Sequence, residues 1–193
     1  MSQKIIVGIT GTHGSGKGTI VDYLKTQGYT HFSATALMRT ELERRGQPVN
    51  RLGYSLLANE WRAQFGSEYI ADTLYKQAQA SSDNALIEAI YTIGEIDKLR
   101  SAAQAGGEKF VLLAIDADQK VRYERIQEHR KGEKDNVTFR EFVAHEAGEM
   151  KSSDPSRQNL AACRERADIV LFNNGSKEDL FRELDEKLGM VQL

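Results

Sequence analysis

The sequence has little of what secreted, membrane-anchored or disordered chains require. Its single cysteine, Cys163, excludes an internal disulfide and a zinc site of the paired-cysteine type, and it favours a reducing, cytoplasmic location. Only 2 of the 193 residues are proline, and no apolar run reaches the roughly 18 residues of a membrane span. The 26 basic and 28 acidic residues nearly cancel, which argues against nucleic acid or a membrane surface as a partner. We expect a monomer or homodimer.

The composition, with 40% hydrophobic and 28% charged residues, is that of one folded domain over residues 1–193. Short apolar, often β-branched runs are typical of buried parallel strands and occur at residues 4–10, 30–33, 85–90, 110–115 and 169–172. Helical spacing of apolar residues occurs at 19–24, 37–45, 52–65, 69–80, 95–103, 121–130, 139–150 and 180–188. This alternation predicts an α/β fold, with helices on both faces of a parallel sheet.

The predicted strands are unevenly spaced. About fifty residues of helical pattern separate the second strand from the third, whereas a simple crossover needs only about a dozen. The fourth and fifth strands are also far apart, and the segment between them is rich in arginine and lysine. We therefore expect two elaborations of one core, at residues 36–80 and 120–150.

The clearest motif is a glycine-rich loop between the first predicted strand and the first helix. Residues 11–19 read GTHGSGKGT, which fits the Walker A pattern G-x-x-x-x-G-K. Such a loop turns backbone N–H groups toward a polyphosphate, and the positive end of the next helix dipole points at the same charge. The predicted nucleotide-binding residues of the loop are Gly11, His13, Gly14, Ser15, Gly16, Lys17, Gly18 and Thr19. Lys17 would lie between the outer phosphates, and the hydroxyl of Thr19 would face Mg²⁺.

The end of this loop, GKGT, resembles that of the adenylate kinase branch of P-loop kinases, the nucleoside monophosphate kinases. That resemblance implies a three-layer P-loop kinase fold with a five-stranded parallel sheet in the order 2-3-1-4-5. It also implies a helical acceptor-binding arm, here residues 36–80, and an arginine-bearing lid, here residues 120–150. Both match the uneven spacing of the strands.

Two further segments are similar to acceptor-site motifs of these kinases. The segment SATALMR, residues 33–39, resembles the one that binds the acceptor monophosphate, which implies that Arg39 grips that phosphate. In LIEAIY, residues 86–91, Glu88 takes the place of an aspartate that holds magnesium through water. Tyr91 stands where the resemblance would place an arginine.

The C-terminal half is similar to dephospho-CoA kinases and to phage and archaeal deoxynucleoside monophosphate kinase-like proteins. The shared features are an Arg-x4-Arg helix, with Arg125 and Arg130, and the ending ADIVLFNNG at residues 167–175. The resemblance implies that these arginines contact the transferring phosphates. It also implies that the loop of Asn174 and Gly175 lies against the adenine.

These features predict an ATP- and Mg²⁺-dependent phosphotransferase. The acceptor favoured is a nucleoside or deoxynucleoside monophosphate, since SATA offers no aspartate of the kind that dephospho-CoA kinases carry there. The predicted catalytic residues are Lys17, Arg39, Glu88, Arg125 and Arg130, and the predicted metal-binding residues are Thr19 and Glu88. Two alternatives stay open: a kinase for a hydroxyl acceptor such as dephospho-CoA or a nucleoside, with Glu88 as base, or a protein that binds a nucleotide without transfer.

Overall fold

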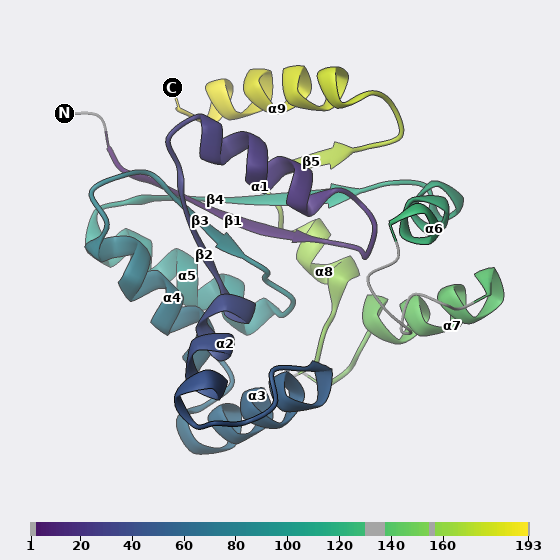
Figure 1. Ribbon diagram of the computed structural model, residues 1–193. Helices are drawn as coiled ribbons and strands as arrows, with labels where there is room; N and C mark the ends of the chain where they lie inside the picture. The colour runs from purple at the N-terminus through teal and green to yellow at the C-terminus, as the bar shows by residue number, and fades with distance from the viewer. Residues whose placement is uncertain (1–2, 130–137, 155–156, 193) are drawn as a thin grey trace.

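The computed structural model describes residues 3–129, 138–154 and 157–192. Its centre is a five-stranded parallel sheet in the order β2-β3-β1-β4-β5, which confirms the predicted fold class and strand order (Figure 1). The strands are β1 (Ile5–Gly11), β2 (Thr30–Ser33), β3 (Ala85–Glu88), β4 (Lys109–Asp116) and β5 (Ile169–Phe172). Four of the five lie within one residue of the predicted bounds at both ends, and β3 ends two residues early.

The parallel register brings the carboxyl ends of the strands to one edge of the sheet. Gly11 of β1 pairs with Ile115 of β4, and Glu88 of β3 pairs with both Ile9 and Ser33 of its neighbours. In open α/β sheets, ligands bind beyond the carboxyl ends of the strands. The glycine-rich loop and the end of β3 therefore meet at the edge where a ligand is expected.

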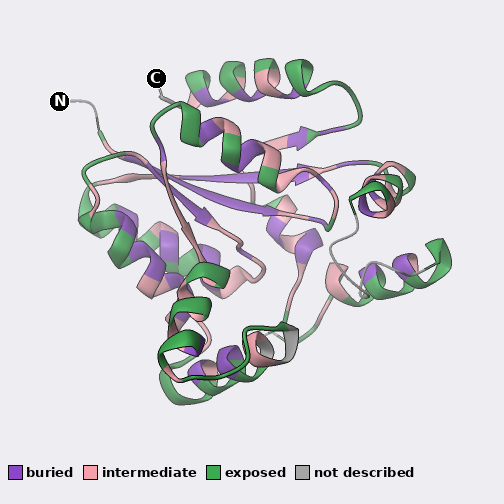
Figure 2. Cartoon of the chain, in the orientation of Figure 1, coloured by how far each residue is buried: buried purple, intermediate pink, exposed green. Residues whose placement is uncertain are grey.

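Helices cover both faces of the sheet (Figure 1). The helices α1 (Lys17–Thr26) and α9 (Lys177–Gln192) pack on one face, where Ile20, Leu24 and Leu184 join β1 and β4 in a buried cluster. The other face carries α4 (Tyr69–Ala80), α5 (Ile93–Gly106) and α8 (Leu160–Glu165). The inner strands β1, β3 and β4 are mostly buried between these two layers, whereas the edge strand β2 is only half-buried (Figure 2).

Two helical elaborations extend from this core. The helices α2 (Ala34–Arg44) and α3 (Arg51–Phe65) project beyond the sheet, and α4 returns the chain to it. The helices α6 (Gln119–Glu128) and α7 (Phe139–Met150) lie at the opposite side of the same edge. In the described part of the chain, no helix has the length and apolarity to cross a membrane.

The helix α8 is the one described element that the sequence pattern did not predict. It is only six residues long, LAACRE, too short to show a helical period. The side chain of Asn159 caps it by accepting from Ala162 N at 3.1 Å, and Leu160 and Cys163 are buried against the core. Its stability therefore comes from one cap and from tertiary packing.

Candidate functional site

The glycine-rich loop has the geometry of a phosphate cradle. It runs from the end of β1 to the start of α1, with Gly14 at φ 78° and Gly16 at φ 100°. Residues with a Cβ avoid these angles, and a Cβ on Gly16 would lie 2.3 Å from Nδ2 of Asn173. That amide donates a hydrogen bond to Ser15 O at 2.9 Å. The loop is thus held against the end of β5 by Asn173, a neighbour of the predicted Asn174.

Lys17 is folded over the loop. Its Nζ donates to the carbonyls of Gly11 and Thr12 at 2.8 Å each. Burial lowers the pKa of Lys17 to about 8, although the carboxylates of Glu88 and Glu149 act in the opposite direction. A phosphate bound here would favour the charged ammonium, which burial disfavours. The hydroxyl of Ser15 is also buried and makes no hydrogen bond within the described residues.

A carboxylate at the end of β4 fixes the other side of the loop. Asp116 Oδ1 accepts from the Thr12 hydroxyl at 2.8 Å and from Ala117 N at 2.9 Å. Its Oδ2 pairs with Arg164 of α8 at 2.6 Å. Sequence reasoning missed this residue, although an acid that directly follows a buried strand at the ligand edge was a usable signal.

A buried ion pair links the loop to α7. Arg122 of α6 pairs with Glu146 of α7, and their side chains are 5% and 7% exposed. Arg122 also donates to His13 O at 3.3 Å and to Ala117 O at 2.7 Å. The mixed-charge pattern around Arg122 is that of a solvated helix face, so its burial could not be read from sequence spacing.

A cavity of about 660 Å³ opens in front of the loop. It lies between the loop, the arm and α7, and is lined by Gly11, His13, Lys17, Thr35, Tyr54, Tyr91, Ile126, Phe142, His145, Glu146, Glu149, Gln158 and Leu160. Its volume is within the usual range for small-molecule sites, roughly 300–1,000 Å³. We call it the phosphate cavity.

A second cavity, of about 280 Å³, lies under the arm. It is bordered by α2, α3, α4 and the residues that follow β3, and it shares Thr35, Tyr91 and Gln158 with the phosphate cavity. Two compartments joined in this way can hold two substrates end to end. We call the second compartment the acceptor pocket.

Glu88 lies on the wall of the acceptor pocket. Its Oε2 is 3.1 Å from Nε2 of His31 on the neighbouring strand β2. This hydrogen bond lowers the pKa of Glu88, with a smaller contribution from the charge of Lys17. Glu88 is therefore ionised at neutral pH and faces the site as a carboxylate.

The predicted metal ligands have the chemistry that Mg²⁺ prefers. Thr19, in the first turn of α1, offers a hydroxyl, and Glu88 offers an ionised carboxylate. No group of three or more His, Cys, Asp or Glu side chains within the described residues could form a cage for a metal.

The predicted arginines lie in different surroundings. Arg39 is exposed on α2 and borders neither cavity, whereas Arg62 of α3, which sequence reasoning missed, lines the acceptor pocket. Arg125 donates to Asn173 O at 2.9 Å, next to the loop. Arg130 lies outside the described residues. The phosphate-binding roles of Arg39, Arg125 and Arg130 stay predictions.

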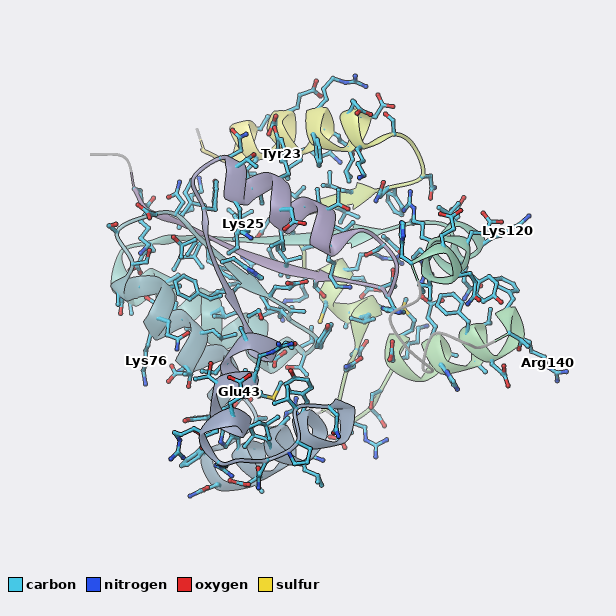
Figure 3. The ribbon with its side chains drawn as sticks, viewed as in Figure 1. Tyr23, Lys25, Glu43, Lys76, Lys120 and Arg140 are labelled. Atoms are coloured by element: carbon cyan, nitrogen blue, oxygen red, sulfur yellow. The ribbon has the colours of Figure 1, made fainter. Side chains whose placement is uncertain are left out.

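The remaining predicted residues of this half lie at its surface. Asn174 Oδ1 accepts from Asp118 N at 2.7 Å, which ties the loop after β5 to the start of α6, and Gly175 is exposed. Lys120 and Arg140 point outward from α6 and α7 in Figure 3. The basic residues of this region therefore divide into buried structural ones and solvated ones.

Comparison with known proteins finds relatives that match nearly the whole chain. The chain is 26% identical to a UPF0200 protein of Pyrobaculum aerophilum over 188 residues, 97% of each chain. A UPF0200 protein of Thermococcus sibiricus is also 26% identical, over 192 residues and 96% of each. These names state no activity.

Similar solved structures cover 98% of this chain. They include TT1252 from Thermus thermophilus, with a TM-score of 0.63, 22% identity and 99% of that chain covered. A gluconokinase from Sinorhizobium meliloti has a TM-score of 0.59, with 15% identity and 93% covered. The APS kinase CysC of Mycobacterium tuberculosis, solved with AMPPNP and APS, has a TM-score of 0.57, with 14% identity and 99% of that chain covered. The shared fold is that of P-loop kinases.

The family model described as AAA domain, AAA_17, matches residues 10–140. The match takes in the glycine-rich loop, the arm, β3, β4 and α6, which form most of the two cavities. Since the match covers well over half of the sequence, this chain belongs to the AAA domain family.

Proposed function

We propose that the protein transfers the γ-phosphate of ATP, with Mg²⁺, to a nucleoside or deoxynucleoside monophosphate. The observation that carries the proposal is the acceptor pocket beside the phosphate cavity, with Arg62 as the one lysine or arginine among its described lining residues. A guanidinium suits a monophosphate because its two N–H groups match two phosphate oxygens. Arg62 thus supplies the positive charge that Tyr91 does not.

In the proposed reaction, the loop holds the donor and the arm holds the acceptor. The backbone N–H groups of residues 14–19 and the ammonium of Lys17 bind the donor phosphates, as the loop geometry favours. Thr19 and Glu88 would hold Mg²⁺, which, when bound, neutralises charge on the β and γ oxygens. Arg62 orients the acceptor phosphate. Its oxygen is already an anion, so the transfer needs no protein base.

The predicted arginines retain their places in this proposal. Arg125, held at Asn173 O, is one hydrogen bond away from the loop and can turn toward the donor. Arg39 would reach the acceptor only if the arm moved, since it is exposed and outside both cavities here. Closure that excludes water from the phosphates is a general need of this chemistry.

The proposal is tested by an ADP-release assay across nucleoside monophosphates, deoxynucleoside monophosphates, nucleosides and dephospho-CoA. We expect ADP with at least one monophosphate. The Arg62→Ala variant should raise the KM for that acceptor by about 10- to 150-fold, the worth of a charged hydrogen bond, while the KM for ATP stays the same. Arg44→Ala, which removes an exposed arginine from α2, is the matched control. ADP release at background with every monophosphate would refute the proposal.

The environment of Glu88 supports a second candidate, transfer to a hydroxyl group. The carboxylate lines the acceptor pocket in its ionised form, as a general base must. Burial, followed by the charge of Glu88, raises the pKa of Tyr91 to about 12, so Tyr91 stays a neutral hydroxyl there. If a nucleoside or dephospho-CoA is the acceptor, Glu88→Gln should remove the rise of rate with pH. An unchanged pH profile would exclude Glu88 as the base.

A further inference from the structure

Glu95 is a buried carboxylate on the wall of the acceptor pocket. It lies in the first turn of α5 and is 8% exposed. Acidic side chains are almost never buried to this degree without a partner. Neither the proposed transfer nor the sequence motifs give this residue a role in binding.

Only one of its two oxygens is used by the fold. Oε2 accepts from Tyr91 N at 2.9 Å and from Thr92 N at 3.1 Å, while the Thr92 hydroxyl accepts from Glu95 N. This is a capping box, which accounts for a Glu or Gln at this position. Within the described chain, Oε1 of Glu95 accepts no hydrogen bond.

The free oxygen borders open space. Apart from the ion-paired Glu146 Oε1, the fully buried side-chain atoms of the described chain that make no hydrogen bond are Thr10 Oγ1, Ser15 Oγ and Tyr54 Oη. Because Oε1 of Glu95 has no partner and is not among them, it is accessible, and the space that Glu95 lines is the acceptor pocket. A buried acceptor that faces a pocket is satisfied by a donor on whatever fills it.

The rest of the pocket indicates what that donor is attached to. Its walls near the arm are apolar, with Met38, Ile70 and Leu74, which suits the faces of a flat ring. The reacting end of an acceptor must lie where Thr35 and Tyr91 border both cavities. The base is then left for the buried wall, where a carboxylate oxygen can meet a polar group on the ring edge.

We propose that Oε1 of Glu95 accepts a hydrogen bond from an exocyclic amino group on the acceptor's base. The inference rests on the proposed function for the identity of the acceptor. It selects cytosine, adenine or guanine over bases that present a carbonyl at the same position, because a carbonyl oxygen would face Oε1 of the Glu95 carboxylate. Burial raises the pKa of Glu95, whereas the charge of Arg62 on the same wall favours its ionised form. A carboxylate that accepts from a base amino group is a standard means of base discrimination.

The substitution Glu95→Gln tests this without removing the helix cap. Glutamine also serves in a capping box. Its amide oxygen would take over the two backbone N–H groups, which places its NH₂ group where Oε1 now lies. The pocket would then offer a donor in place of an acceptor. Preference should reverse toward carbonyl-bearing bases.

The experiment measures, by calorimetry, the affinity for three matched pairs: cytidine and uridine, adenosine and inosine, and guanosine and xanthosine monophosphates. The donor site is filled with Mg²⁺ and a non-hydrolysable ATP analogue. We expect the natural protein to bind the amino-bearing member of at least one pair about 5- to 150-fold more tightly, and Glu95→Gln to reverse that order. Asp97→Asn, on the exposed side of the same helix, is the control and should keep the affinity order of the natural protein.

Equal affinity within every pair, an unchanged order in Glu95→Gln, or no binding of any monophosphate would overturn the inference. Reversal without ADP formation in the transfer assay would support the role of Glu95 and refute the proposed function. ADP formation with no discrimination within any pair, in either protein, would support the proposed function and refute the role of Glu95.

Discussion

Replacing Gly16 with alanine tests whether the loop is built as a rigid cradle. At φ 100° an alanine is strained by about 1–2 kcal/mol. Its Cβ would also lie 2.3 Å from Asn173 Nδ2, which displaces the amide and breaks its hydrogen bond to Ser15 O, worth about 1 kcal/mol. Together these effects should lower the free energy of unfolding by about 2–3 kcal/mol.

The assay is urea unfolding, with thermal unfolding as a second measurement. The expected loss corresponds to a decrease in Tm of roughly 4–12 °C for a domain of this size. The control is Gly18→Ala, since Gly18 lies in the same loop, is in the first turn of α1, and has no heavy atom within 4 Å of the position that a Cβ would take. Alanine there should leave stability unchanged or raise it by up to about 1 kcal/mol.

A double substitution separates the two causes. In an Asn173→Ala background, Gly16→Ala meets no amide, so only the backbone strain should remain and the two losses should not add. Equal stability of the Gly16→Ala and Gly18→Ala proteins would refute the account of the loop.

Two further predictions concern charge. Because burial lowers the pKa of Lys17 to about 8, the ammonium is present at pH 7 and is mostly lost at pH 9, so ATP affinity should fall by up to about tenfold over this range in calorimetric titrations. Lys17→Met should show no such dependence, and a flat profile in the natural protein would contradict the assignment. Glu146→Gln removes the negative charge that pairs with the buried Arg122, and it should lower the free energy of unfolding by about 3 kcal/mol. The control is Asp179→Asn, which removes the charge of the exposed Arg182–Asp179 pair and should change that free energy little. A Glu146→Gln protein as stable as Asp179→Asn would show that this ion pair does not hold α7.

The sequence predicted the parts of the fold that follow from short-range patterns. The five strands and the glycine-rich loop are read from continuous apolar runs and from residue types that only a tight turn explains, as Gly16 illustrates. It could not predict α8, because six residues do not complete two helical turns and the helix depends on tertiary packing.

Residues that belong to a local motif could be selected from the sequence, and those that depend on three-dimensional proximity were missed. Lys17 and Glu88, which belong to motifs, line the two cavities, and their roles stay predictions. Arg62 and Glu95 enter the acceptor pocket from different helices, and Asp116 acts through Thr12, more than a hundred residues away in the chain. Nothing in the residues next to Arg62 marks its contact with the pocket, whereas the place of Asp116 directly after a buried strand was a usable signal.

The central claim is that the loop between β1 and α1 binds the phosphates of ATP for transfer. The most direct test compares ADP formation by the natural protein and by Lys17→Ala, with saturating ATP, Mg²⁺ and the acceptor that the panel identifies. We expect turnover to fall by several orders of magnitude in Lys17→Ala while circular dichroism shows an unchanged fold. A Lys17→Ala protein that forms ADP at the natural rate would contradict the account.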